Sequence, residues 1–216
     1  YGDSGVPVIR AMDLKDITKI EDFLCADPRE QLFFLKQGDI LISSIGEGSI
    51  GKVQVFSDAV KCATVSEVSV IRCTGYNSYA LATFLRTSYG YLQLERRITG
   101  STGQLHLYPK DIASVTVPVL PVTAQKDIEE LFVQSDSESR KSKALYLQAE
   151  QLLLDELGFK DLDLRHQLCY TVPYKKTKEA GRLDAEYFQP KYEWLEERLR
   201  QYKNGAKSLG SLIRPV

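Results

Sequence analysis

The stretch from Thr123 to Leu157 contains neither proline nor glycine, and helix-forming residues dominate it. A helix of this length spans on the order of 50 Å at 1.5 Å per residue, which is more than a small domain needs. The sequence predicts a long helix that ends at Gly158 and packs on another long helix. Its seam has the coiled-coil period of three and four residues with a polar, small middle, at Ile128, Leu131, Ser135, Glu138, Ser142, Leu145, Ala149, Leu152 and Glu156.

A second helical segment follows a polar connector. Pro190 is expected to open a helix that runs through Tyr202, and Asn204-Gly205 is expected to end it. Because the chain begins at Tyr1, we expect it to be a fragment. The predicted regions are a globular domain over 1–121 that lacks its N-terminal part, a long spacer helix over 122–158, a connector over 159–182, and a helix with the start of another domain over 183–216.

The first region mixes strand patterns with helix patterns. Short apolar or alternating runs predict strands over 6–9, 39–43, 52–56, 63–73 and 113–120. Helical spacing predicts helices over 28–35, 78–87 and 91–98. The predicted fold class is therefore α+β: a mixed α/β domain with a strand-rich core, followed by long coiled-coil-like helices.

Composition excludes some classes of protein. The chain has 28 Lys and Arg against 29 Asp and Glu, so its overall charge does not indicate nucleic-acid binding. The cysteines are scattered, without a CxxC pair, which favours buried or half-buried thiols in a reducing cytoplasm over a zinc site: they are Cys25, Cys62, Cys73 and Cys169. No apolar run approaches the ~20 residues of a membrane helix, so no membrane partner is expected.

The string GEGSIGK combines two phosphate-binding patterns. Gly46, Gly48 and Gly51 have GxGxxG spacing, and Lys52 would complete a Walker A loop if Val53 were Ser or Thr. Such loops deliver a phosphate to the N-terminus of the following helix. Here KVQVF follows and alternates like a strand, which favours a structural hairpin in which the glycines allow positive φ.

Catalytic constellations are missing from the sequence. The two histidines, His106 and His166, form no HExxH motif, and no nucleophile elbow or methyltransferase catalytic loop is visible. Scattered acidic residues near the start are expected to form a solvated surface. We therefore expect a binding module that is not an enzyme and needs no cofactor or metal.

Polar and basic residues on loops and one helix remain as candidate DNA contacts. Arg and Lys neutralise phosphates, whereas Asn, Gln, Ser and Arg can read base edges. Solvated helix charges and core tyrosines are the competing interpretation. The predicted phosphate contacts are Lys52, Arg86, Arg96 and Arg97, and the predicted base-edge or groove contacts are Tyr76, Asn77, Ser101, Thr102 and Gln104.

The order of segments over residues 5 to 157 carries a resemblance. GVPVIRAMDL, LKQGDILISSIGEGSIGKVQVF, SYALATFLRT, ITGSTGQLHLYPKDIASVTVPVLP and TAQKDIEELF follow one another. This succession resembles a target recognition domain and its spacer helix in the specificity subunit of type I restriction-modification systems. The segment that precedes and begins another recognition domain in this family is similar to GRLDAEYFQPKYEWLEERLR followed by SLGSLIRPV.

The resemblance implies a non-catalytic protein that reads one half of a split DNA site. Its implied partners are double-stranded DNA, adenine-specific methyltransferase subunits and a restriction-translocase subunit, in a host-defence complex. The spacer helix of this chain would pack antiparallel on a second spacer helix. That second helix would come from a second recognition domain or from a second copy of the chain.

Three alternatives stay open from the sequence. The chain fits the recognition region of a single-chain restriction-methylase fusion, whose enzymatic parts lie outside it. A nucleotide-binding enzyme would use the loop from Gly46 to Lys52. A coiled-coil scaffold would instead carry a protein-binding domain.

Overall fold

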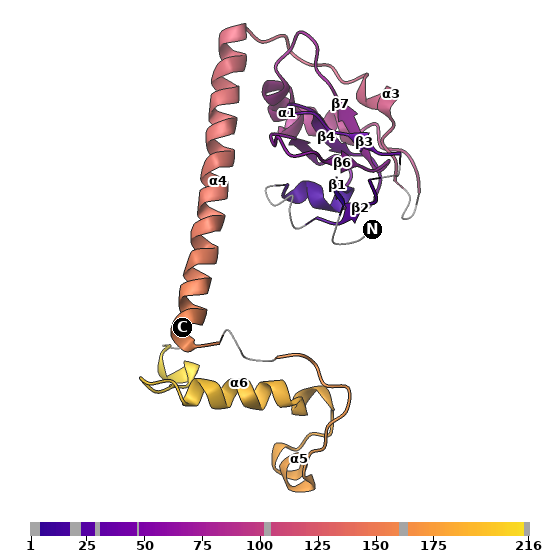
Figure 1. The fold of residues 1–216 in the computed structure, drawn as a ribbon. Helices are drawn as coiled ribbons and strands as arrows, with labels where there is room; N and C mark the ends of the chain where they lie inside the picture. Colours follow the sequence, from indigo (N-terminus) through magenta and orange to yellow (C-terminus); the bar gives the residue numbers. More distant parts are fainter. Residues whose placement is uncertain are drawn as a thin grey trace. The chain divides into compact units, whose positions relative to one another are not determined.

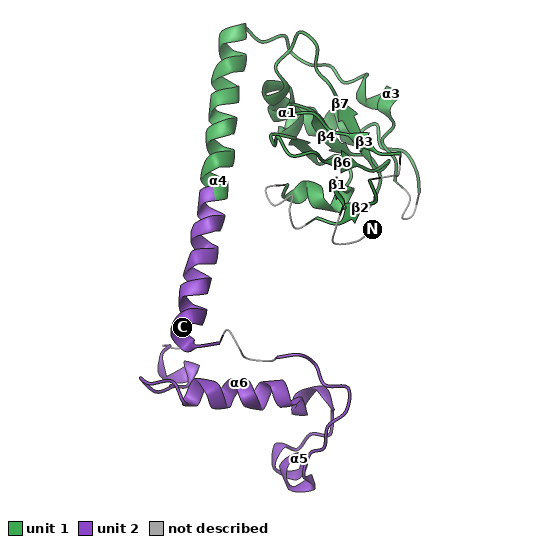
Figure 2. Ribbon diagram, viewed as in Figure 1, with its two compact units in different colours: residues 1–140 green, residues 141–216 purple. Residues whose placement is uncertain are grey.

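The computed structural model describes residues 5–17, 23–28, 31–46, 48–101, 105–159 and 164–213. It contains both helices and strands, so the chain is of the α+β class (Figure 1). Two compact units comprise residues 1–140 and 141–216, and the boundary falls within one long helix (Figure 2).

Two small sheets form the framework of the first unit. A four-stranded sheet has the order β2-β1-β6-β3, and only its β1–β6 pair is parallel; a three-stranded antiparallel sheet has the order β5-β4-β7. The strands are β1 (Val6–Ile9), β2 (Cys25–Ala26), β3 (Phe33–Phe34), β4 (Ile40–Ser43), β5 (Val53–Val55), β6 (Ala63–Thr64) and β7 (Val68–Ile71).

Helical segments cover and extend these sheets. In the first unit they are the 3₁₀ helix η1 (Ala11–Lys15) and the α-helices α1 (Ser78–Arg86), α2 (Ser88–Glu95) and α3 (Pro109–Ile112). The helix α4 (Val122–Leu157) runs from the first unit into the second. The second unit adds α5 (Tyr174–Ala180), η3 (Glu186–Phe188), α6 (Pro190–Arg200) and η4 (Leu209–Ser211).

Strand β4 is the centre of the first unit. All four of its residues are buried, as expected for a continuous apolar run with packing on both faces. Ile40 and Ile42 pack with residues of α1, α2 and α3, whereas Leu41 packs with residues of β1 and η1. The three-stranded sheet therefore lies between a helical layer and the β1–η1 layer.

Helices α1 and α2 are joined by a tight turn with specific caps. The side chain of Asn77 accepts hydrogen bonds from the backbone N–H groups of Tyr79 and Ala80 at the start of α1. A Cβ atom at Gly90 would lie 2.3 Å from the Phe84 carbonyl oxygen. Glycine is therefore required for the close approach of α2 to α1.

One face of α4 attaches the helix to the rest of the first unit. Its residues recur at the spacing of a single helical face, and we call Gln125, Glu129, Phe132, Asp136 and Arg140 the docking face. The buried amide oxygen of Gln125 accepts the Asn77 backbone N–H at 2.8 Å, and Glu129 accepts the Asn77 side-chain amide at 2.7 Å.

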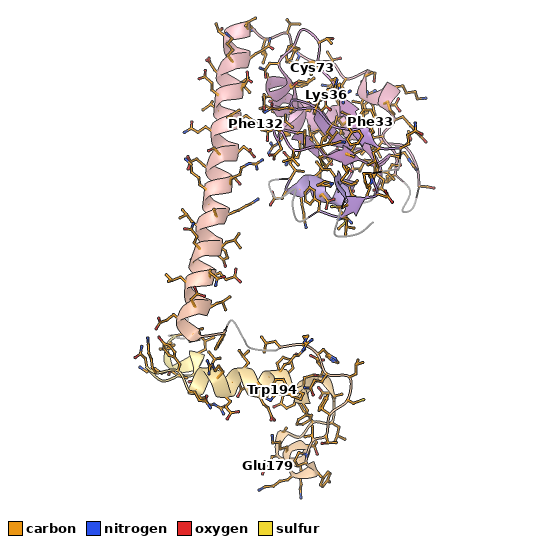
Figure 3. The ribbon with its side chains drawn as sticks, viewed as in Figure 1. Phe33, Lys36, Cys73, Phe132, Glu179 and Trp194 are labelled. Carbon is orange, nitrogen blue, oxygen red and sulfur yellow. The ribbon has the colours of Figure 1, made fainter. Side chains whose placement is uncertain are left out.

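Aromatic and ionic contacts continue this attachment along α4. The rings of Phe132, which is labelled on α4 in Figure 3, and Tyr79 lie with centroids 5.3 Å apart. Burial raises the pKa of Tyr79, with Glu129 and Asp136 adding in the same direction. Arg140 donates to Asp58 at 2.9 Å and to Asp136 at 3.0 Å. The first half of α4 thus belongs to the same packed unit as the sheets.

Most of the seam predicted from the sequence is exposed and lies on another face of α4, but its first residue, Ile128, is half-buried and lies at helical spacing with Gln125 and Phe132 of the docking face. Leu131 is 67% exposed, Leu145 63% and Leu152 71%. We call these three residues the seam. The long helix itself is confirmed, and it ends before Gly158, which has the left-handed φ of 67° expected of a helix stop.

The second unit is held by polar contacts around α6. The buried amide of Gln189 pairs with both backbone groups of Gln167, accepting at 3.0 Å and donating at 2.9 Å. Glu156 accepts bonds from Lys203 and Tyr202, which lower the pKa of that carboxyl, so the end of α4 contacts the segment after α6. The helix predicted from Pro190 is confirmed.

Three element predictions are wrong for the first unit. Within the helix predicted over 28–35, Phe33 and Phe34 form strand β3, because pairing with β6 prevails over local helical spacing; residues 29–30 lie outside the described residues. The strand predicted over 63–73 divides at a turn into β6 and β7, which join different sheets. Residues 113–120 form no strand.

Candidate nucleic-acid interface

The glycine string forms the connection between two antiparallel strands. Strands β4 and β5 pair in register, with Ile40 opposite Val55 and Ile42 opposite Val53, so the predicted hairpin is confirmed. Gly46, Gly48 and Gly51 have φ values of 111°, 73° and 80°, a region that favours glycine. Because a strand follows Gly51, this loop presents no helix N-terminus to a phosphate.

Three segments meet at this hairpin. A Cβ atom at Gly51 would lie 3.2 Å from the Tyr91 ring on α2. Both Ile45 of the hairpin loop and Thr99 form β-bridges with His106. The hairpin loop, α2 and the segment around His106 therefore make one continuous surface. These segments also carry two acidic residues, the exposed Glu95 and the half-exposed Asp111. From their exposed or half-exposed side chains we select seven as the hairpin face: Lys52, Tyr91, Arg96, Ser101, His106, Tyr108 and Lys110.

The hairpin face carries cations without acidic partners. Lys52, Arg96 and Lys110 are exposed, and none of them forms an ion pair with a carboxylate among the residues that the structure describes. Exposed cations of this kind suit the phosphates of a nucleic-acid backbone. The basic character is local, since the whole chain has a formal net charge of -1.

Aromatic side chains accompany these cations. The rings of His106 and Tyr108 lie nearly parallel, with centroids 5.7 Å apart and an interplanar angle of 9°. The Lys110 ammonium lies 5.9 Å from the centroid of Tyr108. The contacts predicted from the sequence do not include three ring residues of this surface, Tyr91, His106 and Tyr108. The alternation His-Leu-Tyr, with Leu107 buried between two outward rings, was the available signal.

Two of the predicted base-edge contacts make internal contacts instead. Tyr76 donates its hydroxyl to the Pro118 carbonyl at 2.9 Å. Asn77 caps α1 and bonds Glu129 of α4. The structure does not bring these two side chains together with Lys52.

The arginines of the predicted set also differ from one another. Arg86 lies over the Phe132 ring at 5.7 Å, on the side of the docking face. Arg97 donates to the hydroxyl and carbonyl oxygens of Ser114 at 2.6 and 2.9 Å, so it fastens the segment after α3. Arg96 is exposed and has neither contact.

The loop after Thr99 is described only in part. Ser101, a member of the hairpin face, is exposed. Thr102 and Gln104, both predicted as groove contacts, lie outside the described residues.

The cysteines have different environments. Cys25 and Cys62 are buried and Cys73 is half-buried, but Cys169 is exposed, so the expectation of buried thiols is wrong for that residue. Burial raises the pKa of Cys62 to about 11. Within the described ranges no cluster of His, Cys, Asp and Glu suits a metal ion. None of the helices described is long and apolar enough to span a bilayer.

Compared with known proteins, the chain matches no family model, and a search of curated proteins gives no match.

Proposed function

We propose that the chain is a DNA target recognition module like those of type I restriction-modification specificity subunits. It reads one half of a split site in double-stranded DNA and has no catalysis of its own. The observation that carries this proposal is that α4 is fixed through its docking face to the same unit that bears the hairpin face. A recognition surface rigidly joined to a long helix suits a protein that sets a fixed distance between two half-sites.

The hairpin face would supply the DNA contacts. Lys52, Arg96 and Lys110 would neutralise phosphates, which position a protein on the duplex. Tyr91 and Ser101 would approach the groove edges. Thr102 and Gln104, which the sequence predicts as groove contacts, would do the same. The other predicted contacts would affect DNA binding only through the packing of α1, α2 and α4, which their side chains hold in place. They are Arg86, Arg97, Tyr76 and Asn77.

The exposed seam supports a helical partner. A long helix with a free apolar face normally packs on another helix. The partner would be the spacer helix of a second recognition domain or of a second copy. The assembled protein would position adenine methyltransferase subunits and a restriction-translocase subunit in the cytoplasm, either as separate chains or fused to this one.

Selection from a random duplex library tests the recognition role. The intact protein, assembled with its modification subunits, should enrich one split motif. Arg96→Ala should weaken binding across sequences and reduce the salt slope by about 1. Arg97→Ala is the matched control, since it should lower stability and leave the slope unchanged. Absence of an enriched motif, or an unchanged slope in Arg96→Ala, would contradict the assignment.

A further inference from the structure

Strand β3 exposes two neighbouring aromatic side chains. Phe33 is 52% exposed and Phe34 is 38% exposed. β3 is an edge strand that pairs only with β6 among the described strands. Because adjacent side chains on a strand point to opposite faces, an aromatic ring stands on each face of this edge. An edge strand that exposes an apolar side chain on each face is open to a segment that runs along it and contacts both faces.

Three cations surround the two rings. The Lys61 ammonium lies 4.7 Å from the centroid of Phe34, and the Arg72 guanidinium lies 5.3 Å from the centroid of Phe33. Lys36 is exposed in the segment that follows β3, and both Phe33 and Lys36 are labelled in Figure 3. We call these five residues the β3 patch.

The two lysines of the β3 patch have no acidic partner. No carboxylate pairs with Lys36 or Lys61 within the described ranges. Asp39 is buried and is already bound by the Arg72 side chain at 2.9 Å and by the Lys36 backbone N–H at 2.8 Å. The patch therefore attracts negative charge from outside the chain.

A hollow of about 610 Å³ opens beside Phe33. Five of its eight lining residues are apolar, four of them aliphatic and one aromatic, and three are polar, so it can receive an apolar side chain. The lining residues are Gln31, Leu32, Phe33, Thr64, Val65, Ser66, Val68 and Val70.

We propose that the β3 patch binds an acidic polypeptide segment of a partner protein. An apolar side chain of the segment enters the hollow beside Phe33, and flanking carboxylates meet Lys36 and Lys61. A protein ligand is favoured over a nucleic acid because the lining of the hollow is mostly apolar and contains a single aromatic ring on which a base could stack. In addition, the Arg72 fork is occupied by Asp39 and by the Phe34 carbonyl, so it is not available for bidentate binding of a phosphate.

The β3 patch is separate from the hairpin face. Asp39, which binds Arg72 of the patch, immediately precedes β4, whereas the glycine loop follows the same strand. The hollow beside Phe33 extends along β7 from Val70, opposite Leu41, to Val68, opposite Ser43. The proposal does not depend on DNA recognition. It rests only on the residues of the β3 patch and on the hollow beside Phe33.

Fluorescence anisotropy with labelled peptides tests the proposal on the full chain. The probe has a central Leu-Phe pair with three aspartates on each side. Matched probes replace the aspartates by lysines or the central pair by two serines, and an oligothymidylate serves as the nucleic-acid probe. We expect the acidic probe to bind at least about tenfold tighter than the other three.

Variants locate the binding. Phe33→Ala and Lys61→Glu should each weaken the acidic probe at least about fivefold. Lys126→Glu reverses the charge of an exposed side chain on α4, outside the β3 patch, and should leave binding unchanged. Phe33→Tyr should retain binding, which keeps the test valid if the alanine variant fails to fold. Equal affinity for all peptides, tighter binding of the oligothymidylate, or an equal loss in Lys126→Glu would overturn the proposal.

Discussion

The docking face and the seam of α4 have opposite environments along one helix. Phe132 on the docking face contacts Tyr79 and Arg86, whereas its neighbour Leu131 on the seam is 67% exposed. Helical periodicity alone identifies an apolar face. Periodicity does not distinguish an apolar face that packs within the chain from one that is left exposed to bind another helix. The difference teaches that the polar positions, Gln125, Glu129 and Asp136, attach this helix to its own domain.

The largest expected effect comes from disturbing the packing of α1 on α2, since α1 and the residues that cap it contact the docking face. Gly90→Ala would place a Cβ atom 2.3 Å from the Phe84 carbonyl oxygen and 2.5 Å from the Leu85 Cα, so α1 and α2 must separate. We expect a loss of about 3 kcal/mol or more in the free energy of unfolding. Urea denaturation measures it. Gly210→Ala, with no atom within 4 Å of the added Cβ, is the control and should change little.

Two neighbouring substitutions compare the faces directly. Phe132→Ala removes a half-buried ring and should lower the free energy of unfolding by about 2 kcal/mol. Leu131→Ala should cost no more than about 0.5 kcal/mol, because the side chain is exposed. Thermal unfolding of both variants under identical conditions measures the difference. Equal losses would mean that the two faces are not distinct.

Substitutions farther along the helix test what the seam does. Leu145→Glu with Leu152→Glu should weaken helix–helix association about tenfold or more and leave thermal stability nearly unchanged, because both side chains are exposed. Sedimentation velocity of the intact protein measures the association. Leu147→Glu with Leu154→Glu, the same change on another face, should leave association intact. If both pairs behave alike, the seam has no special role.

The smallest effect concerns thiol reactivity. Burial raises the pKa of Cys62 from 9.0 to about 11, so its thiol stays protonated near pH 8. An aromatic disulfide reagent should modify exposed Cys169 rapidly and Cys62 only after unfolding. Since the folded state holds this proton more tightly, stability should fall as pH rises from about 9 to about 11. Rapid reaction of Cys62 in the folded protein would contradict its burial.

Local signals were sufficient for several elements of the fold. The long helix, its stop at Gly158 and the glycine hairpin all follow from short sequence patterns. Strand β3 was mistaken for a helix because its pairing partner, β6, lies far along the chain and no local pattern reveals that pairing. The separation of β6 from β7 likewise depends on which sheet each joins.

The candidate site was predicted only in part. Lys52 and Arg96 are exposed as a phosphate contact requires. Asn77 carries the local signature of a helix cap, and the structure gives it that role. Tyr91 reaches the hairpin only through its contact with Gly51, which joins distant segments and has no sequence pattern.

Methylome sequencing tests the central claim most directly. Genomic DNA from cells that carry the intact gene is compared with DNA from cells in which it is deleted, with the modification genes left in place. We expect adenine methylation to disappear at one split motif and to persist at all others. An unchanged set of methylated motifs after deletion would contradict it.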